Sequence, residues 1–166
     1  MFSKKIEINL EKPDDIIHLE PISDIHIGHA GFDEEHYKKR IKAISKDKNR
    51  YTFFGGDALD AITTYDKRFN PDMSLEHDID NQRLRWQNLS QKLFDIHAEQ
   101  KNEKVWGFFH GNHDYKIPQI SRAYLQNTMC TPNNLTFLGS RGVLGLEVKY
   151  NKKILSQWSI LFMHGS

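Results

Sequence analysis

The sequence VWGFFHGNHD, residues 105–114, decides the expected fold of this chain. Its apolar part, Val105 to Phe109, has the length and composition of a buried strand. One residue later, Gly111-Asn112-His113-Asp114 places an amide oxygen, an imidazole and a carboxylate at the end of that strand. Reactive groups collect at the carboxyl ends of strands in parallel α/β sheets, so this tetrapeptide indicates a functional site more than an ordinary polar turn.

Three further polar motifs stand in the same position, each at the end of an apolar run. They are Asp24-Ile25-His26 after Ile16 to Ile22, Gly56-Asp57-Ala58-Leu59-Asp60 after Tyr51 to Phe54, and Met163-His164-Gly165 after Ser159 to Met163. An Asp-x-His motif alone carries little information, because about one chain in two of this length would contain it by chance. The signal is the ordered set of four motifs, each where a predicted strand ends.

With this ordered set the chain resembles the calcineurin-like metallophosphoesterase superfamily, and in particular its phage and bacterial members. The signature of that superfamily runs Asp-x-His, Gly-Asp-x-x-(Asp), Gly-Asn-His-(Asp/Glu), a lone His often followed by Gly, and finally Gly-His-x-His. The resemblance spans Ser23 to Gly165 and matches the first four motifs in full, but no Gly-His-x-His follows His164.

The resemblance implies the α/β fold class, with a four-layer α/β/β/α sandwich formed by a single domain over residues 1–166. It also implies that this domain is incomplete at its C-terminal end, so that each metal lacks one imidazole and one sheet edge lacks its cover. A shortened gene, an interrupted gene, or a second chain that completes the site would each explain such an end.

The metal ligands are implied by the same resemblance. Asp24, His26 and Asp57 would bind the first metal, and Asp57, Asn112 and His164 the second. Two cations roughly 3.5–4 Å apart can share an ionised water that attacks a phosphate ester, and such a pair needs a bridging carboxylate. Asp57 suits that role because the preceding Gly55-Gly56 lets the backbone turn sharply. The mixed nitrogen and oxygen donors favour manganese, with iron, nickel, cobalt or zinc as alternatives.

His113 and Asp114 are the catalytic candidates. In the superfamily the residue in the place of His113 touches the phosphate and assists the leaving group, a task that suits a titratable imidazole. Asp114 is expected either to fix the tautomer of His113 or to cap a helix over residues 117–127. Asp60, one helical turn after Asp57, is expected to accept hydrogen bonds beside the ligands and not to bind metal itself.

Three functions are compatible with these motifs. The first is a metal-dependent phosphodiesterase, a nuclease among the candidates, which uses a metal-bridging hydroxide. The second is a phosphomonoesterase of the protein-phosphatase type, which ranks lower because Ala61-Ile62 and Phe109-His110 stand where those enzymes carry phosphate-binding arginines. The third is a non-enzymatic scaffold that has lost part of its site.

The composition limits the classes of partner that we expect this chain to bind. The net charge of +1 gives no general basic footprint for nucleic acid, although a phosphate-ester substrate of nucleic-acid type stays open. The single cysteine, Cys130, agrees with a reducing compartment, and no apolar stretch is long enough for a membrane span, so we expect a cytoplasmic protein without a membrane partner. A homo-oligomer or a completing C-terminal fragment are the protein partners that the resemblance implies.

Periodicity predicts the remaining elements. Helices are expected over residues 34–47, 80–101 and 117–127, a half-buried strand over 1–12, and a hairpin over 143–150 and 154–163. Pro21 predicts a sheet edge or a bend before Asp24. The irregular segment from Thr63 to Asp78 is either a substrate-facing flap or a mobile connector, and His29 either contacts the phosphate or lies in an exposed loop.

Overall fold

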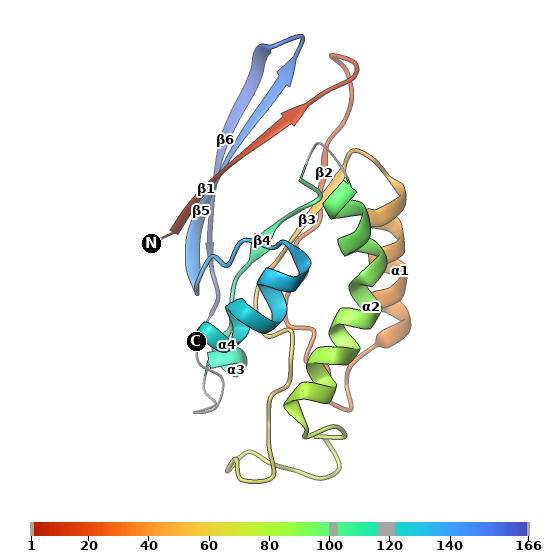
Figure 1. Ribbon diagram of the computed structural model, residues 1–166, viewed down its shortest axis with the longest axis vertical. Helices are drawn as coiled ribbons and strands as arrows, with labels where there is room; N and C mark the ends of the chain where they lie inside the picture. The colour runs from red at the N-terminus through yellow and green to blue at the C-terminus, as the bar shows by residue number, and fades with distance from the viewer. Residues whose placement is uncertain (1, 100–102, 116–121, 166) are drawn as a thin grey trace.

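The fold is mixed α/β, in agreement with the predicted class (Figure 1). A computed structural model describes residues 2–99, 103–115 and 122–165. The elements are β1 (Phe2–Asn9), β2 (His18–Leu19), α1 (Glu34–Lys46), β3 (Arg50–Phe54), α2 (Ile79–Glu99), β4 (Val105–Phe108), α3 (Asn112–Tyr115), α4 (Arg122–Leu125), a π-helical turn (Gln126–Cys130), a 3₁₀ turn (Thr131–Asn133), β5 (Arg141–Tyr150) and β6 (Lys153–Met163).

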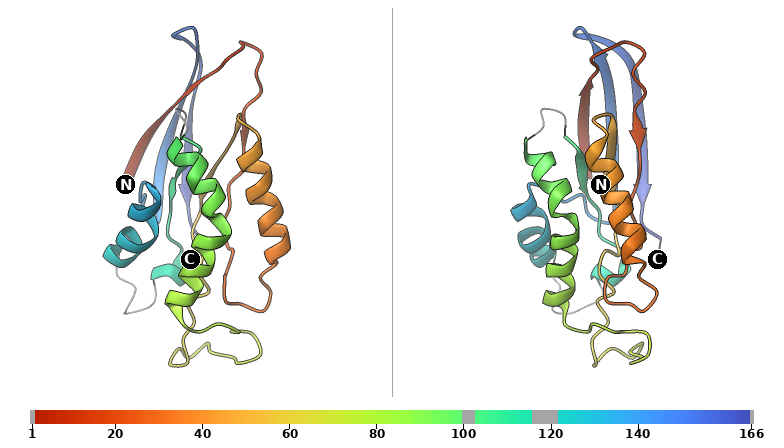
Figure 2. Two further views of the ribbon diagram at one scale, coloured as in Figure 1. Left: turned by 45° about the vertical axis from the view of Figure 1, so that its right-hand side comes forward. Right: turned by 90° about the vertical axis from the view of Figure 1, so that its right-hand side faces the viewer.

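Two small sheets pack face to face. One is fully parallel with strand order β2-β3-β4. The other has the order β1-β5-β6, in which β1 pairs parallel and β6 antiparallel with β5. Helices α1 and α2 lie on the side of the β2-β3-β4 sheet that faces away from the other sheet (Figures 1 and 2). The described residues thus form three layers, namely sheet, sheet and helices.

The central sheet is buried on both faces, as the continuous apolar runs predict for parallel strands. Phe53 belongs to the core between the two sheets, whereas Phe54 belongs to the core under the helices. Likewise, Trp106 belongs to the core between the two sheets and Phe108 to the core under the helices. This alternation fixes the register of β3 and β4, and with it the positions of the loops that follow them.

Most predicted elements are present, with shifted ends. Helix α1 ends one residue earlier than expected, and the predicted strand over Ile16 to Ile22 is reduced to β2 and an isolated bridge between Ile22 and Phe54. The interruption falls at Pro21, which has no N–H to donate, and β2 lies at the edge of its sheet as Pro21 predicts.

The third predicted helix is only partly covered by the described residues. Its first part, residues 117–121, lies outside them, and so do the last two residues of the second predicted helix. After α4 the chain continues as a π-helical turn and a 3₁₀ turn, so the helical region extends beyond residue 127. Among the described residues, no helix combines the length and the apolar character that crossing a membrane requires.

Candidate metal centre

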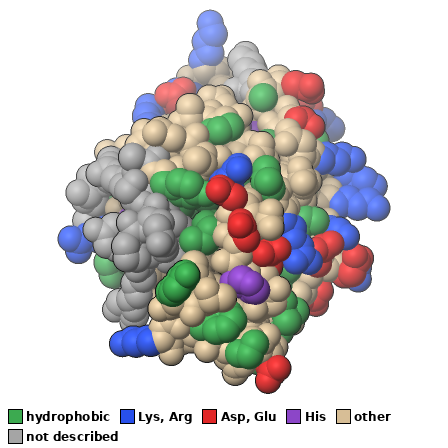
Figure 3. Space-filling model, turned by 60° about the horizontal axis from the view of Figure 1, so that its bottom comes forward, with side chains coloured by type: hydrophobic (Ala, Val, Ile, Leu, Met, Phe, Trp, Pro, Cys, Tyr) green, Lys and Arg blue, Asp and Glu red, His purple; other side chains and the backbone are tan. Residues whose placement is uncertain are grey.

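The four polar motifs meet at one end of the molecule, below the carboxyl ends of β3 and β4 in Figure 1. Figure 3 shows this end, where acidic, basic and histidine side chains gather among hydrophobic ones. Main-chain hydrogen bonds hold the first two motifs together: the N–H of Asp24 donates to the Gly56 carbonyl and the N–H of His26 to that of Asp57, both at 3.0 Å. The loops are therefore joined by backbone, which positions their side chains.

The Asp57 loop and the Gly111 loop touch so closely that a side chain at residue 111 is excluded. A Cβ atom on Gly111 would lie 1.9 Å from Oδ1 of Asp57. That oxygen instead accepts a hydrogen bond from the N–H of His113 at 2.8 Å. The glycine of the Gly-Asn-His-Asp motif thus permits the contact that orients Asp57.

Asp57 Oδ2 faces imidazoles from two directions. It lies 3.2 Å from Nε2 of His164 and 3.9 Å from Nε2 of His26. Donor atoms bound to one metal at about 2.1 Å are separated by about 3.0–3.5 Å, so the distance to His164 matches shared coordination and the distance to His26 is longer than it. Asp57 itself is 2 % exposed, which keeps this carboxylate in place.

His164 is oriented to bind a metal through Nε2. Its Nδ1 lies 2.9 Å from the carbonyl of Gly55, and because a carbonyl can only accept, Nδ1 carries a proton and Nε2 is the nitrogen whose lone pair a metal can take. The Nε2 atom lies 3.2 Å from Oδ1 of Asn112 as well as from Asp57. The three ligands predicted for the second metal are therefore brought together by three separate loops.

Asp24, His26 and Asp57, predicted for the first metal, each offer a donor atom within 4.8 Å of the others. All three have a left-handed backbone, with φ of 53°, 50° and 49°. Residues other than glycine adopt this conformation at a cost of order 1–3 kcal/mol, which proteins tend to accept at functional sites. Asp24 is exposed, and its Oδ2 accepts a 2.5 Å hydrogen bond from Ser23.

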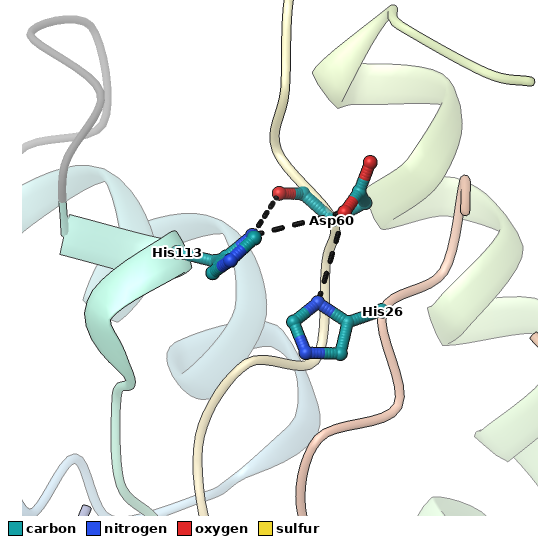
Figure 4. A group of neighbouring side chains, drawn as sticks. All are labelled: His26, Asp60 and His113. Carbon is teal, nitrogen blue, oxygen red and sulfur yellow. Dashed lines mark hydrogen bonds and ion pairs between the residues drawn. The ribbon is translucent and has the colours of Figure 1, made fainter. Parts of the chain in front are cut away.

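Asp60 lies next to two histidines of the site, His26 and His113 (Figure 4). Its Oδ1 lies 3.7 Å from Nδ1 of His26 and 3.7 Å from Nδ1 of His113. Its backbone carbonyl accepts a 2.7 Å hydrogen bond from the Nδ1–H of His113. Asp60, and more weakly the charges of Asp57 and Asp24, raise the pKa of His26, although partial burial opposes the shift. Donor atoms of Asp60, His26 and His113 also lie within 4.8 Å of one another and could hold a metal ion, so the supporting role of Asp60 stays a prediction.

Asp114 does not orient His113, and this corrects one of the two expectations for it. Its Oδ2 accepts hydrogen bonds from the N–H groups of Asp57 at 2.8 Å and Gly111 at 2.9 Å. Asp114 belongs to the one-turn helix α3, and its side chain is fully buried, so it does not reach a substrate. Asp114 is thus a positioning residue that ties the Asp57 loop to the Gly111 loop. Burial raises the pKa of its carboxyl group to about 6.

Arg68 belongs to the site in the structure, although no pattern in the sequence indicates it. Its Nη1 lies 3.4 Å from Nε2 of His113, and its guanidinium pairs with Asp66. Arg68 belongs to the irregular segment from Thr63 to Asp78, whose path cannot be read from periodicity. Only the position of that segment directly after the Asp57 loop suggested that it faces the site.

A cavity of about 410 Å³ opens beside the second predicted metal position, between the Asp24 loop and the end of β6. Its walls include Asp24, Asn112 and His164. His29 does not line this cavity: its Nδ1 accepts a hydrogen bond from the N–H of Gly31, and its ring lies 6.5 Å from the ring of His26, so both roles predicted for it stay open. His110 stacks on Phe137 and is not among the predicted ligands.

No protein-family model matches the chain, and no curated protein matches it significantly. The interpretation of the site therefore depends on the residues and their geometry.

Proposed function

We propose that this chain is a metallophosphoesterase domain of the calcineurin-like type that hydrolyses phosphodiesters, nucleic acids among them. The observation that carries the proposal is the position of Asp57 Oδ2 between His26 Nε2 and His164 Nε2. A carboxylate oxygen shared by two imidazoles is an arrangement suited to two divalent ions. In the fold that we propose, the three described layers belong to a four-layer α/β/β/α sandwich.

The residues present fit two metal ions. Asp24, His26 and Asp57 would hold one ion, and Asp57, Asn112 and His164 the other, with manganese as the preferred metal. Three protein donors for each ion are the number that catalytic metal sites commonly use, with the remaining positions left to water and substrate. When bound, the ions would supply Lewis acidity for the phosphate and a nucleophile at neutral pH.

His113 is positioned to protonate the leaving group. Its Nδ1–H is held by the carbonyl of Asp60, so Nε2 is the atom that accepts and delivers a proton. The Asp60 carboxylate lies 3.7 Å from the same Nδ1, so Asp60 fixes the orientation of the ring. We therefore assign His113 as the general acid that protonates the departing oxygen.

A phosphomonoesterase is the second candidate, and Arg68 is the observation that favours it. The sequence places no arginine where protein phosphatases carry theirs, yet the guanidinium of Arg68 reaches His113 from another segment. A scaffold without activity is the remaining alternative, and it predicts that the chain binds no metal.

The test is the hydrolysis of bis-p-nitrophenyl phosphate and p-nitrophenyl phosphate by the full chain with Mn²⁺, together with calorimetric measurement of Mn²⁺ binding. We expect two bound ions per chain and faster cleavage of the diester. Faster cleavage of the monoester would favour the second candidate. Absence of both metal binding and hydrolysis would overturn the proposal in favour of a scaffold.

A further inference from the structure

Arg68 faces the candidate site in a fixed orientation. Asp66 binds one edge of its guanidinium through two hydrogen bonds: Nε donates to Oδ1 at 2.9 Å and Nη2 to Oδ2 at 2.6 Å. The N–H of Arg68 donates to the same carboxylate at 2.9 Å. Nη1 is the nitrogen left over, and it lies 3.4 Å from His113 Nε2. A guanidinium has five N–H donors in a rigid plane, so fixing one side of it aims the other.

The segment that carries Arg68 is anchored on both sides of the site. Ser74 pairs with His29 in an isolated β-bridge, and the N–H of Ala30 donates to the carbonyl of Met73 at 2.7 Å. The hydroxyl of Ser74, which is buried, reaches Oδ2 of Asp60 at 3.5 Å. These contacts connect the segment to the His26 and Asp57 loops, so Arg68 is held by the same framework as the metal ligands.

We propose that Arg68 binds a non-bridging oxygen of the substrate phosphate and that Asp66 is its positioning residue. The inference rests on the proposed function and deepens it by naming a protein cation in the substrate site. A guanidinium presents donors that match phosphate oxygens, and its positive charge lies next to the atom from which the leaving group takes its proton. An oxygen bound there would replace the long contact between Nη1 and His113.

The charge of Arg68 makes it a specificity residue. A monoester dianion gains more from an added positive charge than a diester monoanion does. Loss of Arg68 should therefore reduce cleavage of p-nitrophenyl phosphate more than cleavage of bis-p-nitrophenyl phosphate. Arg68 would thus contribute strongly to the binding of terminal phosphates and only weakly to the binding of diesters.

The experiment measures binding of inorganic phosphate to the Mn²⁺-loaded full chain by calorimetry. We compare wild type with Arg68→Gln, Arg68→Lys and Asp66→Asn, and use Arg85→Gln as a matched control, because Arg85 pairs with Glu34 on the surface of α1 and α2. Loss of a charge-assisted hydrogen bond should weaken phosphate binding by about 10- to 100-fold in Arg68→Gln. Arg68→Lys and Asp66→Asn should show smaller losses, and Arg85→Gln none. Mn²⁺ affinity and thermal stability should stay at the wild-type value in all four variants.

The outcomes separate the two proposals. Wild-type phosphate affinity in Arg68→Gln, or a wild type that binds Mn²⁺ and cleaves diesters but takes up no phosphate, would overturn the role of Arg68 and leave the proposed function standing. A loss of Mn²⁺ affinity in Arg68→Gln would also overturn it, because the residue would then act on the metals. A wild type that neither binds Mn²⁺ nor cleaves either ester would overturn both.

Discussion

The Nε2 atom of His164 lies 3.2 Å from Oδ2 of Asp57. Asp57 follows β3 in the central sheet, whereas His164 follows β6 in the other sheet. The candidate metal centre therefore spans the interface between the two sheets, and its second half is assembled only when they pack. Binding of metal across this interface should stabilise the packed state, because a ligand that binds only the folded chain favours folding by mass action.

The substitution Asp57→Asn should abolish metal-dependent hydrolysis. Loss of a supporting contact costs metal affinity roughly 10- to 100-fold, and loss of a bridging ligand should cost more. The variant should still fold, because an asparagine Oδ1 can accept the hydrogen bond that His113 now donates to Asp57. Mn²⁺ calorimetry and thermal unfolding measure the two effects separately.

The control for this variant is Asp72→Asn, which changes an exposed carboxylate in the Thr63 to Asp78 segment. It should leave Mn²⁺ affinity and hydrolysis unchanged. Metal-dependent activity retained in Asp57→Asn would refute the bridging role.

The substitution Asp114→Ala should destabilise the metal-free chain by about 2–4 kcal/mol. It removes the acceptor of the N–H groups of Asp57 and Gly111, and a buried donor without a partner costs about 1–3 kcal/mol. Asp114→Asn should cost less, since its amide oxygen can accept from both groups. Urea unfolding of both variants gives the comparison, and equal midpoints for Asp114→Ala and wild type would show that Asp114 does not tie the loops together.

The sequence predicted the ends of the central strands and the residues that follow them, because buried parallel strands are continuous apolar runs. The roles of two residues could not be found in this way. Asp114 lies beside His113 in the chain, but its carboxylate points at backbone N–H groups from two loops, and only the packed loops determine this. Arg68 reaches the site through an irregular segment that is placed by the pairing of Ser74 with His29, and no periodicity signals such a contact.

Lys104 should make stability depend on pH in the alkaline range. The residue is fully buried, its Nζ donates to the carbonyl of Asp47 and lies over the Tyr51 ring, and burial lowers the pKa of its amine to about 8. Between pH 8 and the ordinary value of 10.5, the unfolded chain binds more protons than the folded one. Stability contributed by this group therefore rises as pH increases through that window, by about 3 kcal/mol.

The measurement is urea unfolding of wild type and Lys104→Met at several values between pH 7.5 and pH 10.5. The difference between the free energies of unfolding of wild type and Lys104→Met, taken at each pH, cancels the contribution of other titrating groups. Asp47 keeps a partner for its carbonyl in the variant, because the N–H of Arg50 also donates to it. A difference that stays constant with pH would contradict the lowered pKa of Lys104.

Substitution of Leu161 by lysine should reduce self-association without weakening the fold. Strand β6 is at the edge of its sheet in the described part of the chain, and Lys153 is its only charged residue. Long apolar edge strands pair with other chains, and a charge on such an edge opposes that pairing. Leu161 is 60 % exposed, so its loss from the surface should change the free energy of unfolding by less than about 0.5 kcal/mol.

Leu84→Lys is the matched control, because Leu84 is a leucine of similar exposure, 45 %, in the interior of helix α2, where its own backbone N–H and C=O groups pair within the helix. Light scattering as a function of protein concentration should show aggregation beginning at a higher concentration in Leu161→Lys than in wild type or Leu84→Lys. Equal effects of the two substitutions would mean that added charge alone keeps the protein dispersed. Only an effect specific to Leu161 assigns the association to the exposed edge of β6.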